Sequence, residues 1–135
     1  MKFIPAQDQR LSVRSVEDWQ AQGGEAVSLP NDFDLHAIAE QLPQLSVIAL
    51  QFAKWVDGRA YTQARLLRSR YRFKGEIRAT GEVLVDMLPL LSRTGFDAVQ
   101  LRADQDEQAA RRALGFFPGG HYQGDVLQAQ PGYAR

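Results

Sequence analysis

The feature that most constrains the fold of this chain is an alternation of short apolar runs and helical segments between residues 26 and 114. Strand-like runs are expected at 25–29, 47–52, 76–80 and 98–101. Each run is followed by a stretch with helical periodicity, which is the usual crossover between parallel strands. The alternation therefore predicts a single α/β domain with a mostly parallel sheet, built from about four β-α units. The pattern leaves undecided whether that sheet is open or resembles half of a barrel.

Helices are expected at 31–43, 60–71, 81–93 and 104–114. Asn31, Asp32 and Asp104 are residue types that cap helix N-termini well. Pro89 falls inside the third helix, where its missing N–H should kink or split the segment. The core of the domain is expected over about 26–117, and residues 118–135, rich in Gly and Pro, are expected to form an irregular tail.

The composition excludes several classes of function. With 16 basic and 16 acidic residues the chain has no net charge, so no attraction of the whole chain to nucleic acid or to an anionic membrane is expected. The absence of cysteine excludes thiolate nucleophiles, disulfides and iron–sulfur ligation. The N-terminal residues lack the apolar core of a signal peptide, and no apolar run approaches the ~20 residues of a membrane helix. These features predict a cytoplasmic protein that binds neither nucleic acid nor membrane.

The sequence also lacks the common marks of an independent enzyme. It contains no glycine-rich dinucleotide fingerprint, no phosphate loop and no nucleophile elbow. Neither His36 nor His121 has the spacing of a metal ligand or of a catalytic triad. We therefore predict no cofactor and no metal site, and a non-enzymatic role is favoured over a catalytic one.

Polar loops after the expected strands are the first candidates for a binding site, because ligands of parallel α/β proteins lie at the carboxyl ends of the strands. The most polar loop follows the strand at 47–52 and contains Lys54, Asp57 and Arg59. Asp57 and Gly58 are typical of a simple turn. Alternatively, Arg59 and the free backbone N–H groups of the helix N-terminus bind an anion.

Two further groups of charged residues stand out. Five basic residues lie between positions 65 and 74, interleaved with aromatic side chains: Arg65, Arg68, Arg70, Arg72 and Lys74. A helix that faces a partner is favoured over a nucleic-acid footprint, because these residues do not share one helix face and the net charge is zero. Glu82 and Asp86 have the i,i+4 spacing of one helix face, where they are either a carboxylate pair or a favourable acidic first turn.

The segments 57–68 (DGRAYTQARLLR), 73–79 (FKGEIRA) and 93–97 (RTGFD) resemble DUF934, a family of uncharacterised bacterial proteins, and the resemblance covers roughly 27–117. The family's motif positions that bear candidate side chains here are Asp57, Arg59, Tyr61, Arg65, Arg68, Arg78 and Asp86. Genes of this family neighbour that of sulfite reductase, so the resemblance implies a role in sulfite reduction. The family has no established catalytic residues, so it implies no mechanism.

Two hypotheses follow. The first is an accessory protein of assimilatory sulfite reduction that binds sulfite reductase or its electron donor. The alternative is a protein or enzyme that holds a small anion such as sulfite, sulfate or a phosphate ester in the Asp57–Arg59 loop. The binding candidates are Lys54, Asp57, Arg59, Tyr61, Arg65, Arg68, Arg78, Glu82 and Asp86. The oligomeric state stays open, a homo-oligomer included.

Overall fold

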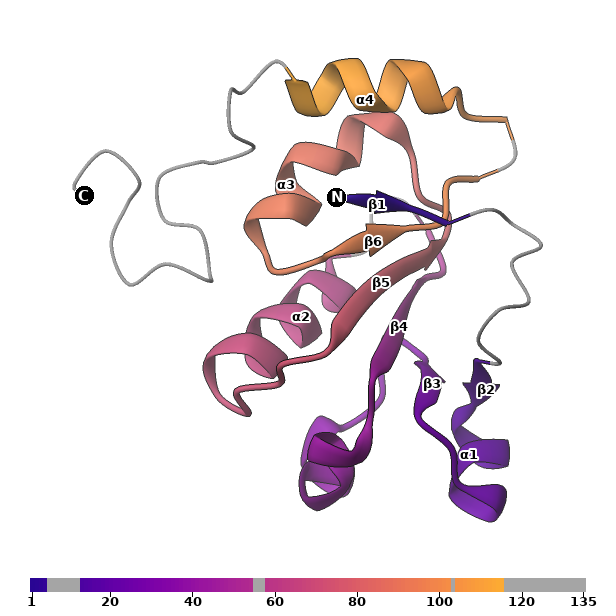
Figure 1. Cartoon of the computed structure of the whole chain (residues 1–135), viewed down its shortest axis with the longest axis vertical. Coiled ribbons are helices and arrows are strands. Elements are labelled where there is room, and N and C mark those ends of the chain that lie inside the picture. The colour runs from indigo at the N-terminus through magenta and orange to yellow at the C-terminus, as the bar shows by residue number, and fades with distance from the viewer. Residues whose placement is uncertain (5–12, 55–57, 103, 116–135) are drawn as a thin grey trace.

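A computed structural model describes residues 1–4, 13–54, 58–102 and 104–115 of the chain (Figure 1). The strands are β1 (Lys2–Phe3), β2 (Arg14–Ser15), β3 (Ala26–Leu29), β4 (Val47–Phe52), β5 (Glu76–Gly81) and β6 (Ala98–Val99). They form one six-stranded sheet in the order β1-β6-β5-β4-β3-β2, and every neighbouring pair is parallel. The predicted α/β class is confirmed, and the sheet is open, with β1 and β2 as its two outermost strands. The predicted tail at 118–135 lies outside the described residues.

The strands alternate with helices along the chain, as expected. The α-helices are α1 (Val16–Gln22), α2 (Arg59–Ser69), α3 (Leu88–Arg93) and α4 (Glu107–Gly115), and the 3-10 helices are η1 (Leu35–Gln44) and η2 (Val85–Met87). Because β2 to β6 lie side by side in chain order, α1, η1, α2 and the pair of η2 and α3 each connect two adjacent strands, whereas α4 follows the last strand, β6.

Two expected helices differ from the structure. The segment expected at 31–43 is a 3-10 helix that begins at Leu35, with Asp34 as its N-cap, because the chain first turns where Phe33 N–H donates to the Pro30 carbonyl. The segment expected at 81–93 is split, as Pro89 predicted. Glu82 N–H still donates to the Phe52 carbonyl at 2.8 Å, so the chain stays extended to Leu84. Pro89 lies in the first turn of α3, where no intrahelical N–H is needed.

The last helix also begins later than expected. Asp106, rather than Asp104, accepts a hydrogen bond from Gln108 N–H at 2.9 Å at the start of α4. The side chain of Asp104 is instead bound by Arg102. Asp104, the predicted N-cap residue, therefore forms an ion pair with Arg102 instead of capping α4.

One face of the sheet packs against the helices and forms the core. The register aligns Val27, Ile48 and Ile77 in one row, and aligns Leu29, Leu50, Ala79 and Val99 in the next. These strand residues belong to a single buried cluster with helix side chains that include Trp19, Ile38, Leu67, Leu88 and Ala110. Alternation along each strand therefore accounts for the whole apolar face.

The opposite face is different in character. The row in register across it consists of Ser15, Ser28, Ala49, Arg78, Ala98 and Lys2. None of these residues belongs to the buried apolar cluster within the described part of the chain. Parallel sheets usually bury both faces. On this face the buried residues of the row, Ala49, Arg78 and Ala98, are small or charged and lie outside the apolar cluster.

Candidate functional site

The carboxyl edge of the sheet, where a site was expected, contains an ion-pair cluster. Arg102, after β6, contacts Glu82, after β5, with Nη1 to Oε2 at 2.7 Å. The same guanidinium binds both carboxylate oxygens of Asp104, at 2.6 Å from Nε and 2.7 Å from Nη2. The cation of this cluster is thus already matched by two carboxylates, which leaves it little capacity to attract a further anion.

The ionisation of the cluster reflects these contacts. Hydrogen bonds from Arg102 lower the pKa of Asp104 to about 2, and the same hydrogen bonds raise the pKa of Arg102 above its usual range. The side chains remain 38%, 41% and 58% exposed for Arg102, Glu82 and Asp104. Exposed ion pairs of this kind add little to stability. The cluster therefore links the residues after β5 and β6 by ion pairs that are exposed to solvent.

The other candidates near this edge are dispersed. Lys54 is exposed in the loop after β4, and Asp57 lies outside the described residues. Arg59 is exposed at the first position of α2, whose N-cap residue Gly58 makes no side-chain capping hydrogen bond. Tyr61 packs edge-on against Phe52, with ring centroids 5.1 Å apart, and burial raises its pKa. Tyr61 is therefore at least partly a core residue.

The predicted pairing of Glu82 with Asp86 on one helix face is wrong. Glu82 follows β5 directly, and Leu84 is still extended, so the two carboxylates are not separated by one helical turn. Glu82 pairs with Arg102, whereas Asp86 is exposed in η2. The reason is the strand ladder, which extends β5 to Gly81, at a φ of 90° that glycine adopts readily.

Arg68 lies at the opposite, amino-terminal edge of the sheet and is buried. Its guanidinium donates to the carbonyls of Gly95, Phe73 and Gly75 at 3.1, 2.9 and 2.8 Å. It also forms an ion pair with Asp97, whose carboxylate accepts a hydrogen bond from Ile77 N–H at 3.0 Å. The Arg68 side chain thus connects the segment after α2 with the residues before β6. Through Asp97 it also connects with the start of β5.

Arg78 belongs to neither edge, since it lies in the middle of β5 on the face without core helices. Two of its nitrogens donate to one oxygen of Glu76, at 3.0 and 2.8 Å, and Lys2 contacts the other oxygen at 2.8 Å. Burial alone would raise the pKa of Glu76, but the hydrogen bonds from Lys2 and Arg78 outweigh it and lower the pKa. The structure therefore pairs Glu82 with Arg102 at the carboxyl edge, and it places Arg68 and Arg78 elsewhere.

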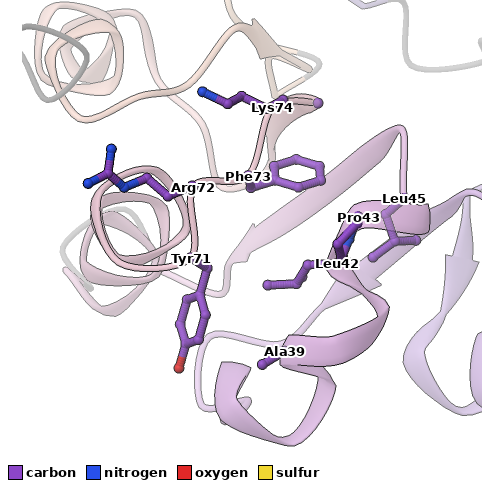
Figure 2. A pocket seen from close by; sticks show the side chains of 9 residues that line it. Ala39, Leu42, Pro43, Leu45, Tyr71, Arg72, Phe73 and Lys74 are labelled. Atoms are coloured by element: carbon purple, nitrogen blue, oxygen red, sulfur yellow. The ribbon is translucent and has the colours of Figure 1, made fainter.

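A pocket at the amino-terminal edge was missed by the sequence analysis. It has a volume of about 230 Å³ between the end of η1 and the segment that connects α2 to β5. The lining residues are Ala39, Leu42, Pro43, Leu45, Tyr71, Arg72, Phe73, Lys74 and Gly75 (Figure 2). Figure 2 shows Leu42 and Tyr71 directed into the space between the two segments, while Arg72 and Lys74 extend outward from its rim. The basic stretch 65–74 was the only sequence signal for it, because the apolar wall comes from a helix distant in sequence.

The cations around this pocket contrast with Arg102. Arg65, Arg72 and Lys74 are exposed and form no ion pair with another described residue, whereas Arg70 lies over the Tyr71 ring with 5.7 Å from Cζ to the ring centroid. The stretch from Gly58 to Gly75 contains no acidic residue. We call the exposed cations of this stretch, Arg65, Arg70, Arg72 and Lys74, the basic surface, and Arg72 and Lys74 are the two that line the pocket. It is a local excess of positive charge on a chain with no net charge.

Two other properties bear on function. Within the part of the chain that the structure describes, no three His, Asp or Glu side chains lie together so that they could hold a metal ion. Over the same residues, no helix has the length and apolar character needed to cross a bilayer.

The fold and its charged surfaces define an open, parallel α/β protein with a basic surface and an apolar pocket at the amino-terminal edge of its sheet. The sequence model of DUF934, a bacterial protein family of unknown function, matches residues 26–133, and the chain belongs to this family. No curated protein and no solved structure matches the chain. The family resemblance noted in the sequence is thereby confirmed.

Proposed function

We propose that this protein is an accessory component of assimilatory sulfite reduction that binds sulfite reductase or its electron donor through the basic surface. The observation that carries the proposal is a pair of exposed cations, Arg72 and Lys74, that line a pocket with apolar side chains and form no ion pair among the described residues. Such cations attract a negatively charged partner, since no described carboxylate forms an ion pair with them. The pathway itself rests on the family resemblance.

Arg68 has a supporting role in this proposal. Its side chain is only 5% exposed, so it does not reach a partner. Its hydrogen bonds to the Phe73 and Gly75 carbonyls instead hold the segment that carries Arg72 and Lys74. The motif position that seemed to be a contact residue is therefore a positioning residue for the contact surface.

The experiment is a binding measurement between the purified full-length protein and purified sulfite reductase, and separately its electron donor, at increasing salt. We expect binding at low salt that weakens as salt rises, because the attraction between exposed charges is screened. The double substitution Arg72→Glu and Lys74→Glu should weaken binding by about tenfold or more, since it turns attraction into repulsion.

The matched control is Arg112→Glu, which reverses another exposed cation on α4, away from the pocket. This variant should bind as the unmodified protein does. If neither the reductase nor the donor binds at low salt, the proposal is wrong. A deletion strain that grows normally on sulfate as sole sulfur source would also contradict it.

A further inference from the structure

The wall of the pocket formed by residues 71–75 is rigidly held, which is unusual for a connection between a helix and a strand. Arg68 binds two of its carbonyls, and its guanidinium lies over the Phe73 ring, 5.8 Å from the centroid. Gly75 packs so closely that a Cβ atom there would lie 2.5 Å from the Ser46 carbonyl oxygen. These contacts restrain the wall before any partner arrives, which lowers the entropy cost of binding.

Arg72 adopts a backbone conformation that a non-glycine residue avoids. Its φ is 56°, and it is the only non-glycine residue with positive φ in the described part of the chain. This conformation costs energy and persists only where the surroundings impose it, as often happens at functional sites. The residue lies just after α2, where Phe73 N–H donates back to the Leu67 carbonyl at 2.8 Å, and this helix end directs the chain that carries Arg72 and Lys74 along the pocket.

The size and chemistry of the pocket indicate what it holds. Its volume of about 230 Å³ is below the ~300–1,000 Å³ of pockets that enclose whole small molecules. Its inner lining is apolar and aromatic, with Leu42, Pro43 and Tyr71, and its rim carries the unpaired Arg72 and Lys74. A space of this size and polarity accommodates one apolar side chain, and the rim favours carboxylates on either side of it.

We propose that this pocket is a peptide-docking site for a short acidic segment of the partner protein. One apolar side chain of the segment enters between Leu42 and Tyr71, and neighbouring Asp or Glu residues pair with Arg72 and Lys74. The proposal deepens the proposed function, on which it rests, by naming the kind of partner segment that the basic surface recognises. It also assigns a ligand class to Leu42 and Tyr71, which were absent from the sequence-based candidates.

The test uses the full-length protein and a panel of nine-residue peptides with a central Leu, Phe or Trp flanked by Glu residues. Matched peptides carry Ser at the centre, or Lys in place of Glu. We expect the acidic apolar peptides to shift the backbone NMR signals of residues 39–45 and 71–75, and both matched sets to leave those signals unchanged. No shift at these residues with any acidic apolar peptide at millimolar concentration would overturn the proposal. So would equal shifts with the Ser-centred peptides or with a single-stranded oligonucleotide.

Three variants separate binding from folding. Arg72→Gly relieves the positive φ, so its unfolding temperature should hold or rise, yet its affinity for the acidic peptides should fall about tenfold with the loss of a charge-assisted contact. Ala39→Phe fills the pocket from its η1 side and should abolish peptide binding in a protein that remains folded. Arg112→Gln is the charge control and should bind normally. Unchanged peptide affinity in Arg72→Gly and in a folded Ala39→Phe would contradict the assigned site.

This outcome is separable from the outcome of the proposed function. If the acidic peptides bind but sulfite reductase and its donor do not, the pathway is wrong and the pocket stands. If the reductase or donor binds and Ala39→Phe binds it equally well, the pocket is wrong and the pathway stands.

Discussion

The two edges of the sheet use the same side-chain type in opposite ways. At the carboxyl edge, Arg102 is paired with Glu82 and Asp104, and all three groups are partly exposed. At the amino-terminal edge, Arg68 is buried and bound to backbone carbonyls, and the exposed Arg72 and Lys74 beside it are unpaired. The arginine at the carboxyl edge is thus held by two carboxylates, while the amino-terminal edge combines a buried arginine that holds backbone carbonyls with exposed cations.

Ligands of parallel α/β proteins usually bind at the carboxyl ends of the strands. That position does not predict where the pocket of this protein lies. That rule rests on loops and helix N-termini meeting at the carboxyl ends of strands. In this protein Arg102, at that end, is paired with Glu82 and Asp104. The pocket with unpaired cations forms instead where the end of η1 meets the segment before β5.

The largest predicted loss of stability is at Arg68, which is buried at the amino-terminal edge. Arg68→Met should lower the free energy of unfolding by about 3 kcal/mol, because it leaves three carbonyls and the Asp97 carboxylate without their donor. Chemical denaturation measures this change. Arg65→Met, on an exposed and unpaired arginine of the same helix, is the control and should change stability by less than about 0.5 kcal/mol. Equal effects of the two substitutions would show that Arg68 does not frame this edge.

A smaller loss of stability is expected at Gly75. A Cβ atom there would lie 2.5 Å from the Ser46 carbonyl oxygen and 2.6 Å from Cζ of Phe73. Gly75→Ala should therefore destabilise the protein by about 2 kcal/mol through overpacking, as measured by denaturation. Gly58→Ala is the control, since nothing lies within 4 Å of its Cβ position and its φ is −87°. If Gly75→Ala is as stable as Gly58→Ala, the wall of the pocket is less tightly held than its contacts indicate.

The smallest effect on stability is expected at the carboxyl edge, where the change appears in a pKa instead. Asp104 should titrate at about 2 in the unmodified protein, as measured by NMR of its carboxyl carbon. In Arg102→Gln its pKa should rise toward ~3.9, the value of an unperturbed Asp, while the unfolding temperature at neutral pH stays nearly constant. Because the pKa is depressed by folding, the pair stabilises the protein above ~3.9 and loses its effect as pH falls toward 2. An unchanged pKa of Asp104 in Arg102→Gln would contradict the pairing.

Much of the fold was predictable from the sequence, because apolar periodicity reports local burial. The run Val47–Phe52 and the stripe of Ala60, Ala64 and Leu67 each identified an element and its buried face. Predictions failed where two competing local interactions had similar strength. Asp104 was predicted to cap a helix, but its side chain binds Arg102 instead. Gly81 was predicted to begin a helix, but it continues β5 and pairs with Phe52.

The candidate site was less predictable, because it depends on contacts between residues that are distant in sequence. The sequence showed that residues 65–74 are unusually basic, but charge patterning alone does not distinguish the buried Arg68 from the exposed Arg72. That distinction depends on which carbonyls converge on one point, and those of Phe73, Gly75 and Gly95 come from separate parts of the chain. The apolar wall of the pocket likewise belongs to η1, distant in sequence from the basic stretch.

By itself, the amino-acid sequence determined the class of fold, the parallel alternation of strands and helices, and the presence of a basic stretch without acidic residues. These properties depend on neighbours a few positions apart, which the chain order already specifies. Only the tertiary structure decided which arginines are neutralised, which is buried, and where a pocket opens. Those outcomes depend on contacts between β5, β6, η1 and the segment after α2, and such contacts exist only once the sheet has brought distant residues together.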